Sequence, residues 1–90
     1  MTERDAIIQN EHGIHCRPTA VIIKSIGDYA GEITIDCGGS TADPRSMLAL
    51  MSLCLVKGTA LTIRVNGPGE EEMADRLKEL FETNFDFDRD

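Results

Sequence analysis

Residues 11–20, EHGIHCRPTA, place a histidine directly before a segment with helical periodicity. After Pro18, apolar side chains recur at spacings of three and four residues, as they do along one face of a helix: Ile22, Ile23, Ile26 and Tyr29. Proline is tolerated in a first helical turn, because its missing N–H would have no partner within the helix. The pattern predicts a helix over about residues 16–27 that ends near Gly27, with His15 at its N-terminus.

The start of a helix is an environment that suits phosphate. Its first N–H groups have no acceptor within the helix, and the positive end of the helix dipole lies there. Imidazole is a nucleophile near neutral pH, and Arg17 adds a guanidinium whose geometry matches phosphate. A lone histidine in a loop is more often an ordinary surface residue, but these neighbours favour function. We expect His15 to accept a phosphoryl group that the backbone N–H groups of Cys16 and Arg17 stabilise.

Four other segments alternate between apolar and polar residues, as half-buried strands do. They are residues 4–9, 31–37, 40–43 and 60–65. The glycine pair at 38–39 is a hairpin signal that joins the second of these segments to the third. The side chains expected to face the core are Ala6, Ile8, Ile33, Ile35, Cys37, Leu61, Ile63 and Val65.

Two more helices are expected. One lies near residues 47–53, and its start has two candidates: Asp43 as the cap with Pro44 in the first turn, or Ser46 as the cap. The other spans residues 70–83, with glutamates in its first turn and an apolar stripe along one side. The stripe consists of Met73, Leu77, Leu80 and Phe81.

The resulting order is strand, helix, strand, strand, helix, strand, helix. Each helix needs an apolar surface to cover, and one four-stranded antiparallel sheet with all three helices on one face provides that surface. The sequence therefore predicts an α+β fold, an open-faced β-sandwich.

Length and composition predict a single small domain over residues 1–90, with residues 82–90 as a tail that can fray. No apolar run approaches the roughly 20 residues of a membrane span, and the first residues lack a signal-peptide profile. The cysteines at 16, 37 and 54 are odd in number and scattered. We therefore expect a cytoplasmic protein with reduced thiols and no membrane insertion.

The net charge of −7 is concentrated toward the end of the chain. Residues 1–66 contain seven acidic and six basic side chains, whereas residues 67–90 contain nine acidic and three basic ones. Such an acidic chain lacks the cations that bind nucleic acid. Four basic residues in the first part form either a local positive patch for acidic partners or separate solvated charges. They are Arg17, Lys24, Arg45 and Lys57.

The stretch GIHCRPTA (residues 13–20) resembles the phosphorylation-site signature of the HPr family, the histidine-containing phosphocarriers of the bacterial sugar phosphotransferase system. A second stretch, RSMLALMSLCLVKGTALTI (residues 45–63), resembles the family's other hallmark: a serine, a short helix, Lys-Gly and a strand. Cys16 and Thr19 depart from the residues that are more common at their positions. The resemblance covers essentially the whole chain and implies the same open-faced sandwich.

The resemblance also implies a function. In this family the histidine, here His15, carries the phosphoryl group on Nδ1. The donor is enzyme I, which is phosphorylated from phosphoenolpyruvate, and the acceptors are the A domains of the enzymes II that serve sugar uptake. Such a protein is a carrier and a covalent intermediate, not an enzyme. We expect it to be a monomer that needs neither a metal nor a cofactor.

Ser46 has two interpretations. It is either an ordinary helix cap worth about 1 kcal/mol, or a site of regulatory phosphorylation by an HPr kinase/phosphorylase, whose added charge would repel an acidic partner. The resemblance favours Ser46 over Asp43 as the helix start. It also implies a surface for partner docking around the site, formed by Met47, Leu48, Met51 and Lys24.

Three alternatives remain open at this point. The first is a nitrogen-branch carrier with the same chemistry and a regulatory output. The second is a regulatory interaction protein that acts through Ser46, against which the presence of His15 speaks. The third is a metal or redox domain built on His12, His15 and Cys16, for which three ligands in one loop are thin evidence.

Overall fold

The computed structural model describes residues 1–11, 13–14 and 16–83. Within that part of the chain, the elements follow the predicted order. They are β1 (Thr2–Ile7), α1 (Cys16–Ile26), β2 (Glu32–Cys37), β3 (Ser40–Ala42), α2 (Met47–Ser52), β4 (Ala60–Asn66) and α3 (Glu70–Phe81).

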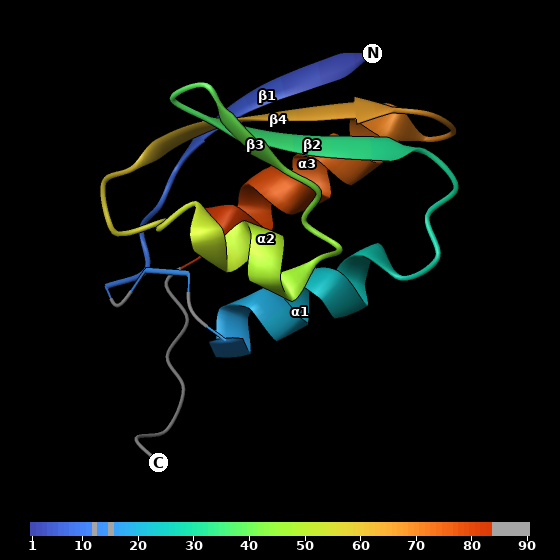
Figure 1. Cartoon of the computed structure of the whole chain (residues 1–90). Helices are drawn as coiled ribbons and strands as arrows, with labels where there is room; N and C mark the ends of the chain where they lie inside the picture. Colours follow the sequence, from blue (N-terminus) through green and yellow to red (C-terminus); the bar gives the residue numbers. More distant parts are fainter. Residues whose placement is uncertain (12, 15, 84–90) are drawn as a thin grey trace.

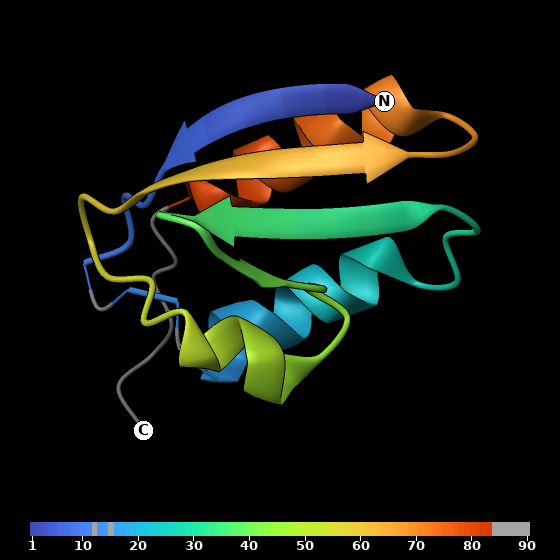
Figure 2. The same ribbon diagram turned by 45° about the horizontal axis from the view of Figure 1, so that its top comes forward.

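The four strands form one antiparallel sheet in the order β1-β4-β2-β3. The central strand β4 pairs on both sides, so that Ile63 lies opposite Arg4 of β1 and Ile35 of β2. All three helices lie on one side of this sheet (Figures 1 and 2). The predicted α+β open-faced sandwich is therefore confirmed.

The hydrophobic core lies between the sheet and the helices, and the strand alternation predicts its members well. Of the eight side chains expected to face inward, seven are buried and Cys37 is half-buried. Ile7 points to the opposite side of the sheet and is 47% exposed. The helices close the core with apolar side chains that are fully buried: Ile22 from α1, Leu50 from α2, and Leu77 and Phe81 from α3.

Strand β1 starts and ends two residues earlier than the expected 4–9. Its start is set by the central strand, because Thr2 still has a partner in Val65. Beyond Ile7 the chain leaves the regular ladder, although the N–H of Ile8 donates to the carbonyl of Thr59 at 2.9 Å.

Helix α3 ends at Phe81, two residues before the expected residue 83, and Glu82 is its C-cap. Thr83 still bonds back to the helix, since its hydroxyl donates to the carbonyl of Glu79 at 2.6 Å. The rest of the tail that we expected to fray, residues 84–90, lies outside the described residues. Within the described ranges, no helix has both the length and the apolar character required to cross a membrane.

Candidate functional site

The helix predicted after the histidine begins at Cys16 and ends at Ile26, followed by Gly27 in a left-handed conformation with φ of +59°. Pro18 lies in the first turn and is fully buried, as its tolerance at this position allows. The first turn contains no acidic residue. His15, like His12, lies outside the described residues.

The loop before α1 is held by hydrogen bonds to a distant segment. The N–H of Ile14 donates to the carbonyl of Leu55 at 2.7 Å, and Ile14 is buried. The side-chain amide of Asn10 donates to the carbonyl of Gly13, whose own N–H donates to the Asn10 carbonyl at 2.9 Å. Gly13 and Ile14 are therefore held by hydrogen bonds to Asn10 within the loop and to the carbonyl of Leu55.

Gly13 is required where these two segments meet. Its φ is +73°, a conformation that side chains other than glycine rarely adopt. A Cβ at this position would lie 2.5 Å from the carbonyl oxygen of Leu55 and 3.1 Å from Cα of Val56. The glycine of the GIHCRPTA motif thus permits close approach of the backbone at 55–56, a contact that no local pattern predicts.

Cys16 and Arg17 are both exposed on the first turn of α1. The sulfur of Cys16 lies 3.8 Å from the thioether sulfur of Met51, which comes from α2. The start of α1 and the second half of α2 therefore lie side by side. The backbone N–H groups of these first two residues belong to the turn in which N–H groups have no acceptor within the helix.

Ser46 is the N-cap of α2. It has extended backbone angles (φ −101°, ψ 112°), and its hydroxyl accepts a hydrogen bond from the N–H of Ala49 at 3.2 Å. The alternative cap, Asp43, binds Arg45 instead: its carboxylate accepts from the Arg45 backbone N–H at 2.9 Å and from the guanidinium. Burial raises the pKa of Asp43, but these hydrogen bonds outweigh it, so the pKa is lowered overall.

Several apolar side chains on α2 and in the following loop are exposed. Leu48 is 80% exposed, Met47 is partly exposed and Met51 is half-buried. Val56 is 60% exposed, and its backbone lies under Gly13, so it borders the same loop. No sequence pattern singles out Val56. The available signal is that it is an apolar residue directly before the Lys-Gly turn.

The four basic residues of the proposed positive patch differ in their exposure. Lys24 is exposed in the last turn of α1, and Arg17 and Lys57 are exposed as well. Arg45 is half-buried, forms an ion pair with Asp43 at 3.0 Å and donates to two carbonyls of the loop before β2. It joins the segment before α2 to that loop, so it is a poor member of a patch for acidic partners.

Among the described residues there is no group of three His, Cys, Asp or Glu side chains that could hold a metal ion. The candidate site of His12, His15 and Cys16 depends on two residues outside the described part. Cys16, Cys37 and Cys54 are free thiols.

Comparisons with known proteins agree with this geometry. A family model described as "PTS HPr component phosphorylation site" matches residues 2–83. The phosphocarrier protein HPr of Haemophilus influenzae is 35% identical over 83 residues, which cover 92% of this chain and 98% of that protein. The corresponding protein of Borreliella burgdorferi is 36% identical over 92% of this chain and 96% of its own.

Solved structures show the same fold. The crystal structure of HPr from Bacillus anthracis superposes with a TM-score of 0.84 at 23% identity, over 90% of this chain and 96% of that one. The family model includes the histidine motif, the serine-capped helix and the whole sheet, and the relatives are matched over nearly their full length. The chain therefore belongs to the HPr family, the phosphocarrier proteins of the bacterial phosphotransferase system.

Proposed function

We propose that this protein accepts a phosphoryl group on His15 from phosphorylated enzyme I and passes it to the A domains of enzymes II. The observation that supports this most directly is that α1 begins at the residue after His15, with no acidic side chain in its first turn. A helix start without its own carboxylate is suited to an incoming phosphate.

In the proposed transfer, a ring nitrogen of His15 attacks phosphorus as the bond between phosphorus and the donor breaks. Positioning and charge neutralisation are the main requirements of such a step. The N–H groups of Cys16 and Arg17 and the Arg17 guanidinium would stabilise the charge without forming a bond to phosphorus. The same groups would release it when the acceptor attacks, so the protein acts as a carrier and not as a complete catalyst.

Partner docking is proposed for the exposed apolar surface of α2, with Met47, Leu48 and Met51 in the contact and Lys24 at its edge. Large exposed apolar side chains mark interaction sites, and methionine adapts to more than one partner. The exposure of Leu48 and Met47 supports this assignment. Lys24 would attract the acidic surface of a partner.

Phosphorylation of Ser46 by an HPr kinase/phosphorylase is proposed as a second, regulatory modification. The side chain is exposed and stands next to Met47 in the proposed docking surface. A phosphate there would add nearly two negative charges and weaken the binding of an acidic partner. As the N-cap, Ser46 also has a structural role that does not depend on modification.

The deciding experiment is incubation with enzyme I and phosphoenolpyruvate, followed by intact-mass spectrometry. We expect one acid-labile phosphate on the wild-type protein and none on His15→Ala, whereas Ser46→Ala should be phosphorylated like the wild type. An acid-labile phosphate on the His15→Ala protein, or none on the folded wild type, would contradict the proposal. Parallel reactions with sugar-branch and nitrogen-branch enzyme I distinguish the two carrier alternatives by rate. Phosphoryl transfer through His15 would also argue against the alternative of a regulatory interaction protein that acts only through Ser46.

We further propose that the protein works as a single-domain monomer in the cytoplasm. A solved HPr of Thermoanaerobacter tengcongensis is described as a dimer, so the state of this chain has to be measured. Sedimentation velocity during phosphorylation would measure it: a monomer that accepts phosphate at the full rate supports the proposal, and activity confined to a dimer contradicts it.

A further inference from the structure

Strand β1 lies at an edge of the sheet, because the strand order is β1-β4-β2-β3. An edge strand presents unpaired N–H and C=O groups that can pair with another chain, and proteins therefore shorten or cover such edges. The other edge, β3, has only three residues, whereas β1 has six. Any protection against edge pairing is therefore needed mainly at β1.

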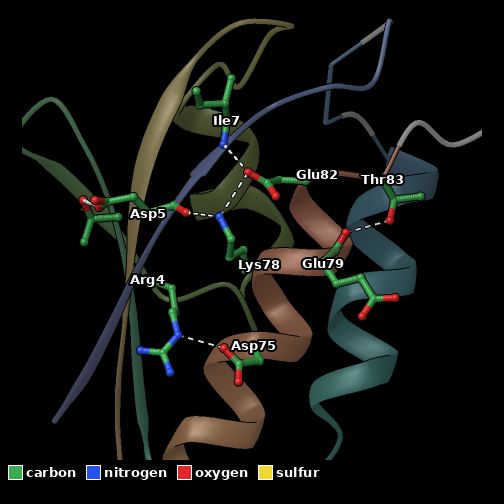
Figure 3. Close-up of polar contacts among 9 residues, drawn as sticks. Arg4, Asp5, Ile7, Asp75, Lys78, Glu79, Glu82 and Thr83 are labelled. Atoms are coloured by element: carbon green, nitrogen blue, oxygen red, sulfur yellow. Dashed lines mark hydrogen bonds and ion pairs between the residues drawn. The ribbon is translucent and has the colours of Figure 1, made fainter.

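Lys78 of α3 and Glu82, the C-cap of that helix, contact the outer edge of β1 (Figure 3). The carboxylate of Glu82 accepts a hydrogen bond from the backbone N–H of Ile7 at 3.1 Å. The ammonium group of Lys78 donates to the backbone carbonyl of Asp5. Lys78 and Glu82 are also paired with each other at 3.3 Å. A donor and an acceptor of the edge are thus both occupied by one ion pair.

A third backbone group on the outer edge of β1 is also covered by a side chain. In an antiparallel strand, every second residue directs its N–H and C=O away from the paired neighbour. Residues 5 and 7 do so here, and residue 3 shares their parity. The guanidinium of Arg4 donates to the carbonyl of Glu3 at 2.8 Å and is itself held by Asp75 of α3 at 2.7 Å (Figure 3). Side chains thus cover backbone groups along the length of β1.

This arrangement is more than an ordinary surface ion pair. Lys78 and Glu82 keep 40% and 33% of their side-chain exposure, and pairs this exposed contribute little to stability. Their contacts go to the backbone atoms that a second strand would need. The edge also borders an open hollow, lined among others by Asp5, Ile7, Thr62 and Lys78.

We propose that Lys78 and Glu82 guard the β1 edge against antiparallel pairing with β1 of a second copy of this chain. With the guard removed, the carbonyl of Asp5 and the N–H of Ile7 become available to the same edge of another molecule. When the second strand also displaces Arg4 from the carbonyl of Glu3, two four-stranded sheets join into one. Asp5 would face its own copy in a pairing centred on that residue, so the dimer is weak and forms only at high protein concentration.

The test compares two double variants of α3. Lys78→Ala with Glu82→Ala removes the guard. Glu72→Ala with Arg76→Ala is the matched control, since these residues form an ion pair with the same spacing, and Arg76 contacts Ser25 of α1 instead of β1. Both variants keep the net charge of the wild type. Sedimentation velocity across a concentration series and hydrogen exchange of individual amides are measured for all three proteins.

We expect the guard variant to approach twice the monomer mass as concentration rises, while the wild type and the control stay monomeric. In dilute solution the Ile7 amide of the guard variant should exchange about tenfold faster. At high concentration the amide of Ile7 should become protected again, and the amides of residues 3 and 5 should become protected with it.

The proposal is overturned if the guard variant stays monomeric throughout, or if the wild type already pairs through this edge. It is equally overturned if the variant associates while those three amides remain fast, because another surface is then responsible. If the double variant does not fold, Glu82→Ala alone replaces it. That variant frees the Ile7 N–H, and the same outcomes decide.

Discussion

Helices α1 and α3 begin in opposite electrostatic settings. The first turn of α3 contains Glu70, Glu71 and Glu72, whereas the first turn of α1 contains no acidic residue. Glu70 accepts hydrogen bonds from the hydroxyl of Thr2 at 2.6 Å and from the N–H of Gly67 at 3.2 Å, and it pairs with the N-terminal ammonium at 3.1 Å. Carboxylates thus belong to the first turn of α3, whereas no residue in the first turn of α1 has one.

The difference shows how one physical property serves two purposes. A carboxylate at a helix N-terminus stabilises the helix. At α3 that stabilisation fastens the end of the sheet, because Glu70 connects the helix to the first residues of β1. The first turn of α1 lacks such a carboxylate, and under the proposed function a phosphoryl group from outside would take that position. The chain would then forgo a small stabilisation at the site proposed to bind an anion.

The largest effect is expected when α1 is made like α3. Cys16→Glu places a carboxylate in the first turn, where it would repel the incoming phosphoryl group. We expect phosphorylation by enzyme I to slow about a hundredfold, while the free energy of unfolding rises by about 0.5 kcal/mol. Quenched-flow mass spectrometry and urea unfolding measure the two effects. Cys16→Gln, which has the same size without the charge, is the control, and equal rates for the two variants would contradict the comparison.

The next effect concerns the loop that precedes α1. Gly13→Ala must adopt a positive φ and bring its Cβ against the Leu55 carbonyl, so we expect a loss of about 2 kcal/mol in the free energy of unfolding. Gly38→Ala separates the two causes, because Gly38 has a φ of +59° but no atom within 4 Å of an added Cβ. A loss of about 1 kcal/mol is expected there. Equal losses in urea unfolding would mean that the close approach at Gly13 costs nothing.

A smaller effect is expected at α2, whose start is capped by a neutral hydroxyl. Ser46→Ala should lower the free energy of unfolding by about 1 kcal/mol, because the N–H of Ala49 loses its acceptor. Ser52→Ala, on the same helix, should change it by less than about 0.5 kcal/mol. Thermal and urea unfolding compare the two, and an unchanged Ser46→Ala protein would show that the cap contributes no stability.

The smallest effect concerns Glu70, whose contacts are partly exposed to solvent and therefore screened. The hydrogen bond from Thr2, helped by the N-terminal ammonium and Gly67, lowers the pKa of Glu70 from 4.5 to about 2. Its stabilisation is therefore present above the unfolded value of 4.5 and is lost as pH falls toward 2. Glu70→Gln should be less stable at pH 7 and lose less stability across that window. Glu71→Gln, an exposed neighbour, should follow the wild-type curve; a Glu70→Gln curve parallel to the wild type would contradict the assignment.

Much of the fold follows from local patterns. Alternation alone predicts the burial of Leu61, Ile63 and Val65, because a strand with one face on a core has a period of two. The cap of α2 was ambiguous by local rules, since Asp43 and Ser46 are both good caps. In the structure Ser46 is the cap, because the Asp43 carboxylate accepts hydrogen bonds from Arg45.

What local patterns do not predict depends on contacts between distant parts of the chain. The guard of β1 joins Ile7 to Glu82 across 75 positions, and nothing in the spacing of α3 distinguishes Lys78–Glu82 from the parallel pair Glu72–Arg76. The bond between Ile14 and Leu55 is of the same kind. The motif identified His15 as the candidate site by its residue types, but the support of the preceding loop appears only once the chain is folded.

That support gives the segment after α2 an unusual constraint. Surface loops normally tolerate an inserted or deleted residue. Here the Leu55 carbonyl lies close against Gly13 and accepts the hydrogen bond from the N–H of Ile14. Changing the length of the segment by one residue would leave each helix and strand able to form, yet shift the surface that backs the phosphorylation motif. A variant with a longer or shorter loop between α2 and β4 could therefore fold normally and still transfer phosphate poorly.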